Sequence, residues 1–195
     1  DIITKKNNNY RENFLKAIQF ADTSRDVYTN IGFSFFSQGD IADALSILNE
    51  GLAKYPDDFR MNYIKALTLQ RDNRESESVE YFEKALLANP NEIQVLSALG
   101  LIYDNQGKYE KSEEIYERAL KIDPQNALVL NNYAYNLSER GVKLDKALAM
   151  SKISLEIEPD NASYLDTIGW IYFKMKNYKQ AKKFLEMSLK INPTL

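Results

Sequence analysis

The feature that most constrains this chain of 195 residues is the spacing of its prolines. They stand at Pro56, Pro90, Pro124, Pro159 and Pro193, so successive prolines are 34, 34, 35 and 34 residues apart. An interval this regular indicates an internal repeat whose unit is one supersecondary element. Proline lacks the backbone donor and disfavours helical angles in the residue before it, so each proline is predicted to end a helix.

Small residues recur at fixed distances from these prolines. Twelve residues before each proline stand Ala44, Ser78, Ser112, Ala147 and Ala181, and five residues before stand Gly51, Ala85, Ala119, Ser154 and Ser188. A third small column comes earlier in each unit, at Gly32, Ala66, Gly100, Ala134 and Gly169. Antiparallel helices approach closely only where side chains are small, so each unit is predicted to be a helix pair. Gly39, Gly107 and Gly141 fall in the expected turn, which often needs a left-handed residue.

The stretch from Ile93 to Pro124, which reads IQVLSALGLIYDNQGKYEKSEEIYERALKIDP, resembles the tetratricopeptide repeat (TPR) almost column for column. The resemblance implies an all-α fold, a right-handed superhelical α-solenoid of antiparallel helix pairs without strands. Residues 1–195 are predicted to form one TPR domain of eleven helices, the first over residues 10–21. Its units are a partial repeat at 10–24 and full repeats at 25–58, 59–92, 93–126, 127–161 and 162–195.

Four residues interrupt this pattern. Asn62 and Lys65 occupy columns that are usually apolar, and Ser151 replaces a usual large residue. The extra residue of repeat 127–161 lies in Val142-Lys143-Leu144, between the turn and the second helix. These departures are expected to affect local packing and to leave the fold intact.

Composition excludes several kinds of function. The chain has no Cys and no His, so it lacks the usual nucleophile pairs and zinc ligands, and its seven Gly form no phosphate-binding loop. We therefore predict no enzyme, no catalytic residues, no metal site and no cofactor. The formal charge of −3 argues against nucleic acid as a partner. Apolar runs stop after about six residues, far short of the ~20 that a membrane-spanning helix needs.

The remaining place for function is the concave surface, which in TPR proteins is lined by the first helix of each unit. Two columns of this helix are expected to face the groove: Thr29, Tyr63, Ser97, Asn131 and Asp166, and Phe33, Leu67, Leu101, Tyr135 and Trp170. Some TPR proteins grip a peptide carboxylate with Lys and Asn in these columns, but the first unit here has Thr29 and Phe33. The columns instead suit an apolar helix or extended segment of a partner protein. Phe33, Leu67 and Leu101 could equally be core residues that cover neighbouring helices.

The two ends of the chain differ in charge. The first full repeat has two basic and six acidic residues, and the last has six basic and two acidic residues. The lysines of the basic end either only increase solubility or form a binding surface for an acidic partner or an anionic lipid. Apolar residues on the last helix predict weak homo-oligomerisation through this end, or a continuation of the chain that covers it: Phe184, Leu185, Met187, Leu189 and Ile191.

Two functions follow from this sequence. The first is a non-catalytic protein–protein interaction scaffold that holds a partner segment or helix in the groove. The alternative is a structural element that assembles with its own copies through its terminal repeats. The last two units resemble the closing repeats of bacterial TPR proteins, some of them envelope or lipoprotein components. The sequence therefore predicts a soluble chain of the cytoplasm or of the bacterial periplasm and envelope, and leaves the compartment open.

Overall fold

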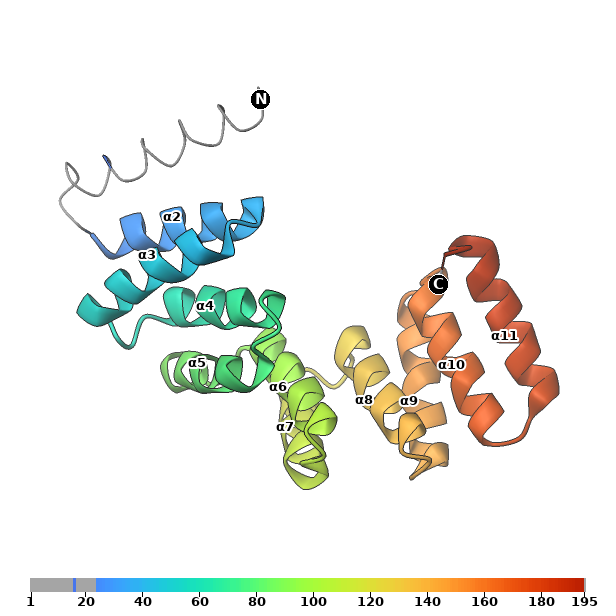
Figure 1. Ribbon diagram of the computed structural model, residues 1–195. Coiled ribbons are helices and arrows are strands. Elements are labelled where there is room, and N and C mark those ends of the chain that lie inside the picture. The colour runs from blue at the N-terminus through green and yellow to red at the C-terminus, as the bar shows by residue number, and fades with distance from the viewer. Residues whose placement is uncertain (1–15, 17–23, 195) are drawn as a thin grey trace, which may run out of the picture. The chain divides into compact units, whose positions relative to one another are not determined.

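A computed structural model describes Lys16 and residues 24–194 of the chain (Figure 1). Within residues 24–194 it contains ten α-helices and no strand, so the predicted all-α fold is confirmed. The helices are α2 (Arg25–Gln38), α3 (Ile41–Lys54), α4 (Phe59–Arg71), α5 (Glu75–Ala88), α6 (Ile93–Asn105), α7 (Tyr109–Ile122), α8 (Ala127–Glu139), α9 (Leu144–Ile157), α10 (Ala162–Lys174) and α11 (Tyr178–Ile191). The helix predicted over residues 10–21 lies outside the described residues except at Lys16, which is helical.

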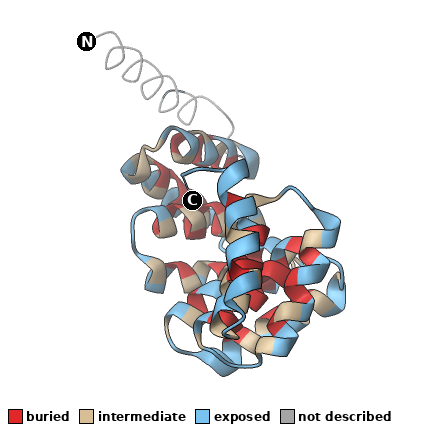
Figure 2. Cartoon of the chain, turned by 90° about the vertical axis from the view of Figure 1, so that its right-hand side faces the viewer, coloured by how far each residue is buried: buried red, intermediate tan, exposed pale blue. Residues whose placement is uncertain are grey.

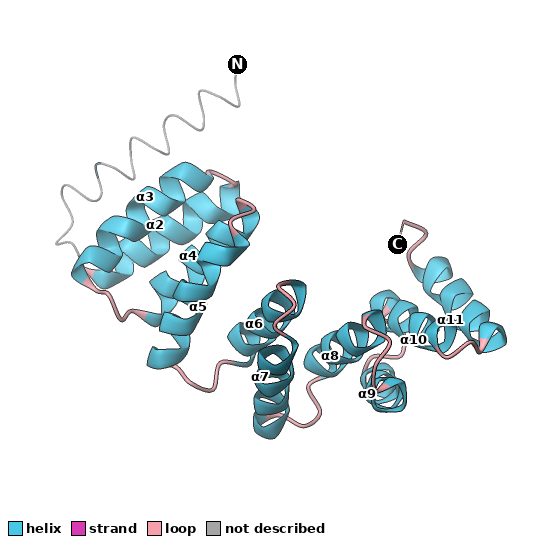
Figure 3. Ribbon diagram, turned by 60° about the horizontal axis from the view of Figure 1, so that its bottom comes forward, coloured by secondary structure: helices cyan, strands magenta, loops and turns pink. Residues whose placement is uncertain are grey.

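The chain divides into two compact units, Asp1–Val95 and Leu96–Leu195. Unit 1 contains α2 to α5 and the first three residues of α6, and unit 2 contains the rest of α6 and α7 to α11. Short loops connect the helices (Figure 3). The grouping of the helices into one domain of five full repeats remains a prediction. Of the helices that the structure describes, none combines the length and apolar character that crossing a lipid bilayer requires.

The same packing recurs inside both units. In unit 1, α2 packs on α3 and α4 packs on α5, and α4 also contacts α2 and α3. In unit 2, α8 packs on α9 and α10 packs on α11, and α10 also contacts α8 and α9. The buried residues lie where neighbouring helices meet (Figure 2). In unit 1, α3 therefore supports both α2 and α4, and in unit 2, α9 supports both α8 and α10, as expected for stacked repeats.

Every residue of the three small columns is buried. A Cβ atom at Gly32 would lie 2.7 Å from Leu48 Cδ2, and one at Gly100 would lie 2.7 Å from Tyr116 Cζ. Ser112 adds a hydrogen bond, because its hydroxyl donates to the Gly100 carbonyl over 2.7 Å. The small columns therefore mark the close helix contacts that the sequence predicted.

The turns between paired helices use left-handed residues. Gly39, Gly107 and Gly141 have φ of +85°, +70° and +67°, as their sequence positions predicted. Asn73 and Lys176 take the same conformation in the α4–α5 and α10–α11 turns, although neither is glycine. The sequence pattern did not identify these two positions.

The departures from the repeat pattern are accommodated locally. The side-chain amide of the fully buried Asn62 donates to the Pro56 and Asp58 carbonyls, both over 2.9 Å. Lys143, in the segment with the extra residue, is left-handed at φ +49° and directly precedes α9. Ser151 is fully buried, and its hydroxyl has no hydrogen-bond partner among the described residues. A small side chain thus fills this column without a compensating polar contact.

Lys65 is buried although its side chain is charged. Its Nζ donates a hydrogen bond to Asn49 Oδ1 on α3 and lies 3.8 Å from the centroid of the Tyr81 ring on α5. Only 8% of the residue is exposed. The ammonium group contacts an amide oxygen and an aromatic face, and no carboxylate among the described residues of unit 1 is in hydrogen-bond contact with it.

A charged network joins α7 to α8 in unit 2. Glu113 accepts hydrogen bonds from Arg140 Nη2 over 3.1 Å, from Tyr133 OH over 3.2 Å and from Lys143 Nζ. Burial alone would raise the pKa of Glu113, but the Lys143 and Arg140 hydrogen bonds hold this pKa below its ordinary value. Arg140 Nε also lies 3.4 Å from Asp104 Oδ1, without the geometry of a hydrogen bond. Burial raises the pKa of Asp104 despite this cation.

Candidate protein-binding surfaces

A pocket of about 280 Å³ opens between the first helices α2 and α4 of unit 1. Its lining consists of Thr29, Asn30, Phe33, Phe59, Arg60, Tyr63, Ile64 and Leu67. We call it the α2–α4 pocket. All of its lining residues belong to unit 1.

Aromatic rings hold the walls of the α2–α4 pocket in place. Phe59 stacks on Tyr63 with ring centroids 5.9 Å apart and an interplanar angle of 8°. Tyr63 also contacts the buried Phe82 of α5, with centroids 6.2 Å apart. Phe33 lies beside Phe36 and is 54% exposed. The pocket therefore presents large apolar surface whose geometry is fixed before any ligand arrives.

Few polar groups line this pocket. The Thr29 hydroxyl donates to the Arg25 carbonyl over 3.0 Å, so its proton is used inside α2. Burial, helped by Glu92, raises the pKa of Tyr63, and its phenol is therefore neutral at physiological pH. Asn30 and Arg60 are exposed, and Arg60 forms no ion pair with any residue in the described part of the chain. These two side chains can bind a polar group beside an apolar ligand.

The structure brings together the four groove residues predicted for the first two full repeats, namely Thr29, Phe33, Tyr63 and Leu67. Sequence reasoning missed the other four lining residues, Asn30, Phe59, Arg60 and Ile64. Phe59 lies one helical turn before Tyr63, so the spacing of aromatic residues four apart was a usable signal. Asn30, Arg60 and Ile64 belong to neighbouring columns that carry no signal of their own.

The six groove residues predicted for unit 2 differ in exposure. Ser97 and Asn131 are buried, and Ser97 accepts a hydrogen bond from Asn132 over 3.3 Å. Leu101 and Tyr135 are 38% and 40% exposed, whereas Asp166 and Trp170 are half-buried. The structure thus leaves four of the six available for contact at least in part.

The sequence reasoning also missed two exposed aromatic residues next to Trp170. Phe173 is 45% exposed and Tyr178 is 60% exposed. Trp170 stacks on Phe173 with centroids 5.2 Å apart and an angle of 15°, and Phe173 contacts Tyr178 at 5.7 Å and 58°. The three rings form a continuous row, which we call the aromatic row, from α10 to the first residue of α11.

The apolar residues predicted to mediate self-association differ in how far α10 covers them. Phe184 stacks on Tyr172 of α10 with centroids 5.6 Å apart, and Leu185 packs against Gly169. Met187, Leu189 and Ile191 are 38%, 48% and 48% exposed. These last three residues are exposed, whereas Phe184 and Leu185 are half-buried.

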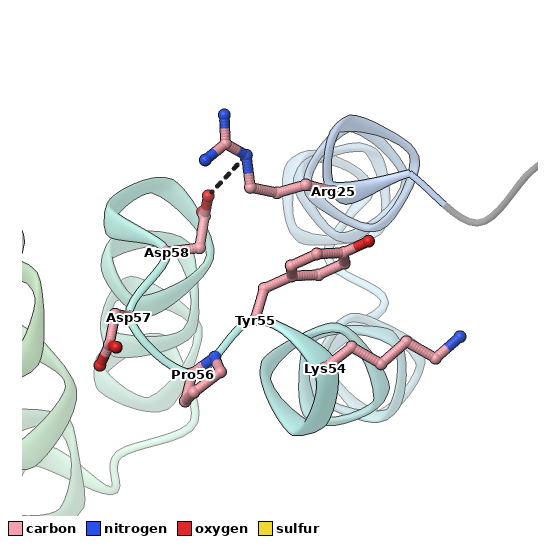
Figure 4. Close-up of a pocket in the computed structure, with 6 residues that line it drawn as sticks. All are labelled: Arg25, Lys54, Tyr55, Pro56, Asp57 and Asp58. Carbon is pink, nitrogen blue, oxygen red and sulfur yellow. Dashed lines mark ion pairs between the residues drawn. The ribbon is translucent and has the colours of Figure 1, made fainter.

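A second pocket of unit 1, of about 320 Å³, is polar and was not predicted from the sequence. Arg25, Lys54, Tyr55, Pro56, Asp57 and Asp58 line it (Figure 4). Arg25 Nε lies 3.3 Å from Asp58 Oδ2, and Asp58 also caps α4 by accepting the Met61 N–H over 2.8 Å. Lys54 points away from this pair and donates to the Tyr28 hydroxyl over 2.7 Å. Arg25, Asp58 and Lys54 are therefore engaged in contacts that hold α2, α3 and α4 together.

Acidic side chains do not gather into a metal site in the described part of the chain. No group of three or more Asp or Glu residues there could hold a metal ion, and the chain contains neither His nor Cys.

Comparison with known proteins identifies the family. The model of the Psidin N-terminal TPR repeats region matches residues 30–136, which is more than half of the chain, and the tetratricopeptide repeat model matches residues 162–195. The chain therefore belongs to the tetratricopeptide repeat family, in agreement with the resemblance seen in its sequence.

Similar proteins include assembly factors. The chain is 30% identical over 125 residues to the type IV pilus assembly protein PilF of Pseudomonas aeruginosa, an alignment of 64% of this chain and 49% of PilF. It is 26% identical over 165 residues to the photosystem I assembly protein Ycf3 of Prochlorococcus marinus, covering 82% of each. A longer TPR repeat-containing protein of Pseudomonas aeruginosa is 20% identical, and the alignment spans 26% of its length and 80% of this chain. The chain thus spans about half the length of PilF and about a quarter of the length of the longer Pseudomonas protein.

Solved structures share the fold. The crystal structure of YrrB, described as a TPR protein with an unusual peptide-binding site, superposes with a TM-score of 0.73 at 21% identity and covers 93% of each chain.

Proposed function

We propose that this chain is a non-catalytic scaffold that binds a segment of a partner protein on its first helices. In unit 1 the α2–α4 pocket receives an apolar side chain of that segment. The observation that carries the proposal is the pocket itself, whose exposed walls are aromatic and aliphatic although they lie on the surface. Apolar pockets with a few polar groups are the usual form of a binding site.

The walls suit an anchor residue. Tyr63 is held between Phe59 and Phe82, so its ring loses little conformational freedom when a ligand binds. A buried apolar side chain in such a pocket typically dominates the binding free energy of an interface. Asn30 and Arg60 can then form hydrogen bonds with the backbone of the same segment.

The relatives support a protein partner. PilF and Ycf3 are assembly proteins by name, and the YrrB structure is described by its peptide-binding site. Within unit 2 the predicted groove residues Leu101 and Tyr135 are exposed and can contact a segment bound to that unit.

Selection from a random 12-residue peptide library tests this proposal. Peptides selected on the wild-type chain should carry a large apolar residue. The Phe33→Ala/Tyr63→Ala variant should bind them more than tenfold more weakly by calorimetry, a loss of about 1.4 kcal/mol or more. Leu87→Ala is the matched control, because Leu87 lies on α5 and is 84% exposed, and it should bind normally. Equal affinity of both variants for the selected peptides would reject the α2–α4 pocket as the binding site.

A second candidate, self-association through α11, rests on the exposure of Met187, Leu189 and Ile191. Leu189→Lys should remove concentration-dependent association in sedimentation experiments over a hundredfold range of concentration. Leu185→Lys is a poor test of this surface, because Leu185 packs on Gly169 within the α10–α11 pair. A wild-type chain that stays monomeric over this range would reject the candidate.

A further inference from the structure

We propose that unit 2 carries a second recognition surface, formed by the aromatic row Trp170, Phe173 and Tyr178 and the lysines around it. Its partner is an acidic peptide segment that carries an aromatic side chain. This surface differs from the α2–α4 pocket in its unit, its residues and the charge of its partner.

The aromatic row is exposed where a soluble helix pair would normally place polar residues. Phe173 and Tyr178 are 45% and 60% exposed, and their rings are in contact with each other. Trp170 is half-buried and stacks on Phe173. Aromatic residues gathered on a surface are characteristic of protein interfaces, where one large ring can bind in several ways to a partner's aromatic or apolar side chain.

Lysines predominate around this row, although Asp166 lies one helical turn before Trp170 and Lys182 pairs with Glu186 over 3.7 Å. Residues 167–185 contain five lysines and neither Asp nor Glu. Lys176 and Lys179 flank Tyr178 in sequence, are exposed, and form no ion pair with a residue in the described part of the chain. Lys174 Nζ lies 4.8 Å from the centroid of the Trp170 ring and donates to the Glu139 carbonyl. The aromatic surface is therefore complementary to a negatively charged ligand.

The backbone at Lys176 is a separate observation that points to the same surface. Lys176 has φ of +61°, in the turn position where the other pairs have Gly39, Asn73, Gly107 and Gly141. Glycine and asparagine take this conformation with the least strain, whereas lysine is disfavoured there. Strained residues tend to occur at functional sites, and here the unfavourable residue puts a cation two positions before Tyr178 in the sequence.

A peptide fits better than a nucleic acid. Residues 167–185 contain no arginine, the residue best suited to hydrogen-bond a phosphate in bidentate fashion. Acidic residues also lie next to this surface, because Asp166 is one helical turn before Trp170 and Lys174 donates to the backbone carbonyl of Glu139. A continuous phosphate backbone would meet these carboxylates, whereas a short acidic segment need not extend so far.

The only tryptophan of the chain belongs to the aromatic row, so its fluorescence reports binding at this surface directly. The probe is a seven-residue peptide of glutamates with a central phenylalanine, titrated into the intact wild-type chain. We expect saturable change in Trp170 fluorescence, and an affinity that falls as salt is added. Replacing the central phenylalanine by alanine should weaken binding at least threefold, and the lysine version of the peptide should not bind.

Charge reversal localises the binding. Lys176→Glu/Lys179→Glu should lower the affinity of the chain for the acidic peptide at least tenfold. Tyr178→Ala should lower it at least threefold. Lys121→Glu/Lys152→Glu is the matched control, because it changes the net charge equally at exposed lysines of α7 and α9 and should leave the affinity nearly unchanged. Circular dichroism checks that each variant is folded.

Three results would overturn the proposal. The first is that the acidic peptide does not bind at millimolar concentration. The second is that the two double charge reversals lower its affinity equally. The third is that a single-stranded oligothymidylate binds more tightly than the acidic peptide. Because Phe33→Ala/Tyr63→Ala alters only unit 1, it should not affect this titration. The two binding proposals can therefore fail independently.

Discussion

The contact between α3 and α4 in unit 1 and the contact between α7 and α8 in unit 2 occupy equivalent places in the repeat. Lys65 and Tyr133 are 68 residues apart, and so are Asn49 and Glu117. In unit 1 Lys65 donates to the neutral amide of Asn49. In unit 2 Tyr133 donates to the Glu117 carboxylate over 3.5 Å and to Glu113 over 3.2 Å.

The difference shows which columns the fold constrains and which it leaves free. The small columns are buried in both units because helix backbones must approach there. The column of Lys65 and Tyr133 accepts a cation or a phenol, provided that the polar end finds a partner on the preceding helix. The contact in unit 2 consequently depends on carboxylates, so its stability depends on pH, whereas the Lys65–Asn49 hydrogen bond joins a cation to a neutral amide.

The largest effect is expected at the shared small column. Ala85→Leu in unit 1 and Ala119→Leu in unit 2 each insert a large side chain at a fully buried contact and should cost about 1 to 3 kcal/mol by chemical denaturation. Ala88→Leu is the control, since Ala88 is exposed on α5 and should tolerate the change. A normal unfolding transition for Ala119→Leu would mean that the proposed alignment of the repeats is wrong.

Removing the charge of Glu113 tests whether the α7–α8 contact contributes more to stability than the α3–α4 contact. Glu113→Gln leaves the Arg140 guanidinium, whose side chain is 13% exposed, with a weaker hydrogen-bond partner. We expect a loss of about 1.5 to 3 kcal/mol, as for other hydrogen bonds to charged groups. Asn49→Ala, the counterpart in unit 1, should lose less, because it removes a hydrogen bond to a neutral amide and the Tyr81 ring still contacts the Lys65 ammonium. Equal losses would show that the two contacts contribute alike despite their chemistry.

Acid should weaken unit 2 through the same carboxylate. The pKa of Glu113 is lower in the folded chain than its ordinary value of 4.5, so the unfolded chain binds its proton first. The ionised Glu113 carboxylate therefore stabilises the folded chain above about pH 4.5, and this contribution is lost as the pH falls through its lowered pKa. Urea denaturation between pH 7 and pH 3 should show a smaller acid-dependent loss in Glu113→Gln than in the wild type. Identical pH profiles would exclude Glu113 as a source of acid sensitivity.

Asp104 should change the pH dependence of stability in the direction opposite to Glu113, and its substitution should have the smallest effect on stability. Burial raises its pKa, Arg140 lowers it and Glu113 raises it, and the net result is a pKa above the ordinary 3.8. Its proton therefore stabilises the folded chain at low pH, and that stabilisation is lost as the pH rises through the folded pKa. Asp104→Asn should raise stability at pH 7 by less than about 1 kcal/mol. Destabilisation by this change would show that the Arg140 contact outweighs the burial of the carboxylate.

Much of the fold could be predicted because it repeats. A single helix pair gives weak evidence, but five units with the same small columns and prolines, three of them with a turn glycine, reinforce one another. Ten of the predicted helices are present, and Gly39, Gly107 and Gly141 are left-handed as expected. The eleventh, over residues 10–21, falls outside the described residues except at Lys16. The sequence by itself thus determined the family, the pairing of helices and the residues at their closest contacts, because these depend on side-chain size and backbone chemistry at a fixed period.

The exposure of the predicted groove residues was decided only by tertiary structure. Thr29, Ser97 and Asn131 are buried, whereas Phe33 and Tyr135 from the neighbouring column are exposed. Helical periodicity shows which residues share a face, but whether that face is covered depends on the next helix. The α2–α4 pocket, the Glu113 network and the aromatic row all arise where side chains from different helices meet. These contacts depend on the angle at which the helices pack and on the volume of every neighbouring side chain. The repeat pattern in the sequence specifies neither.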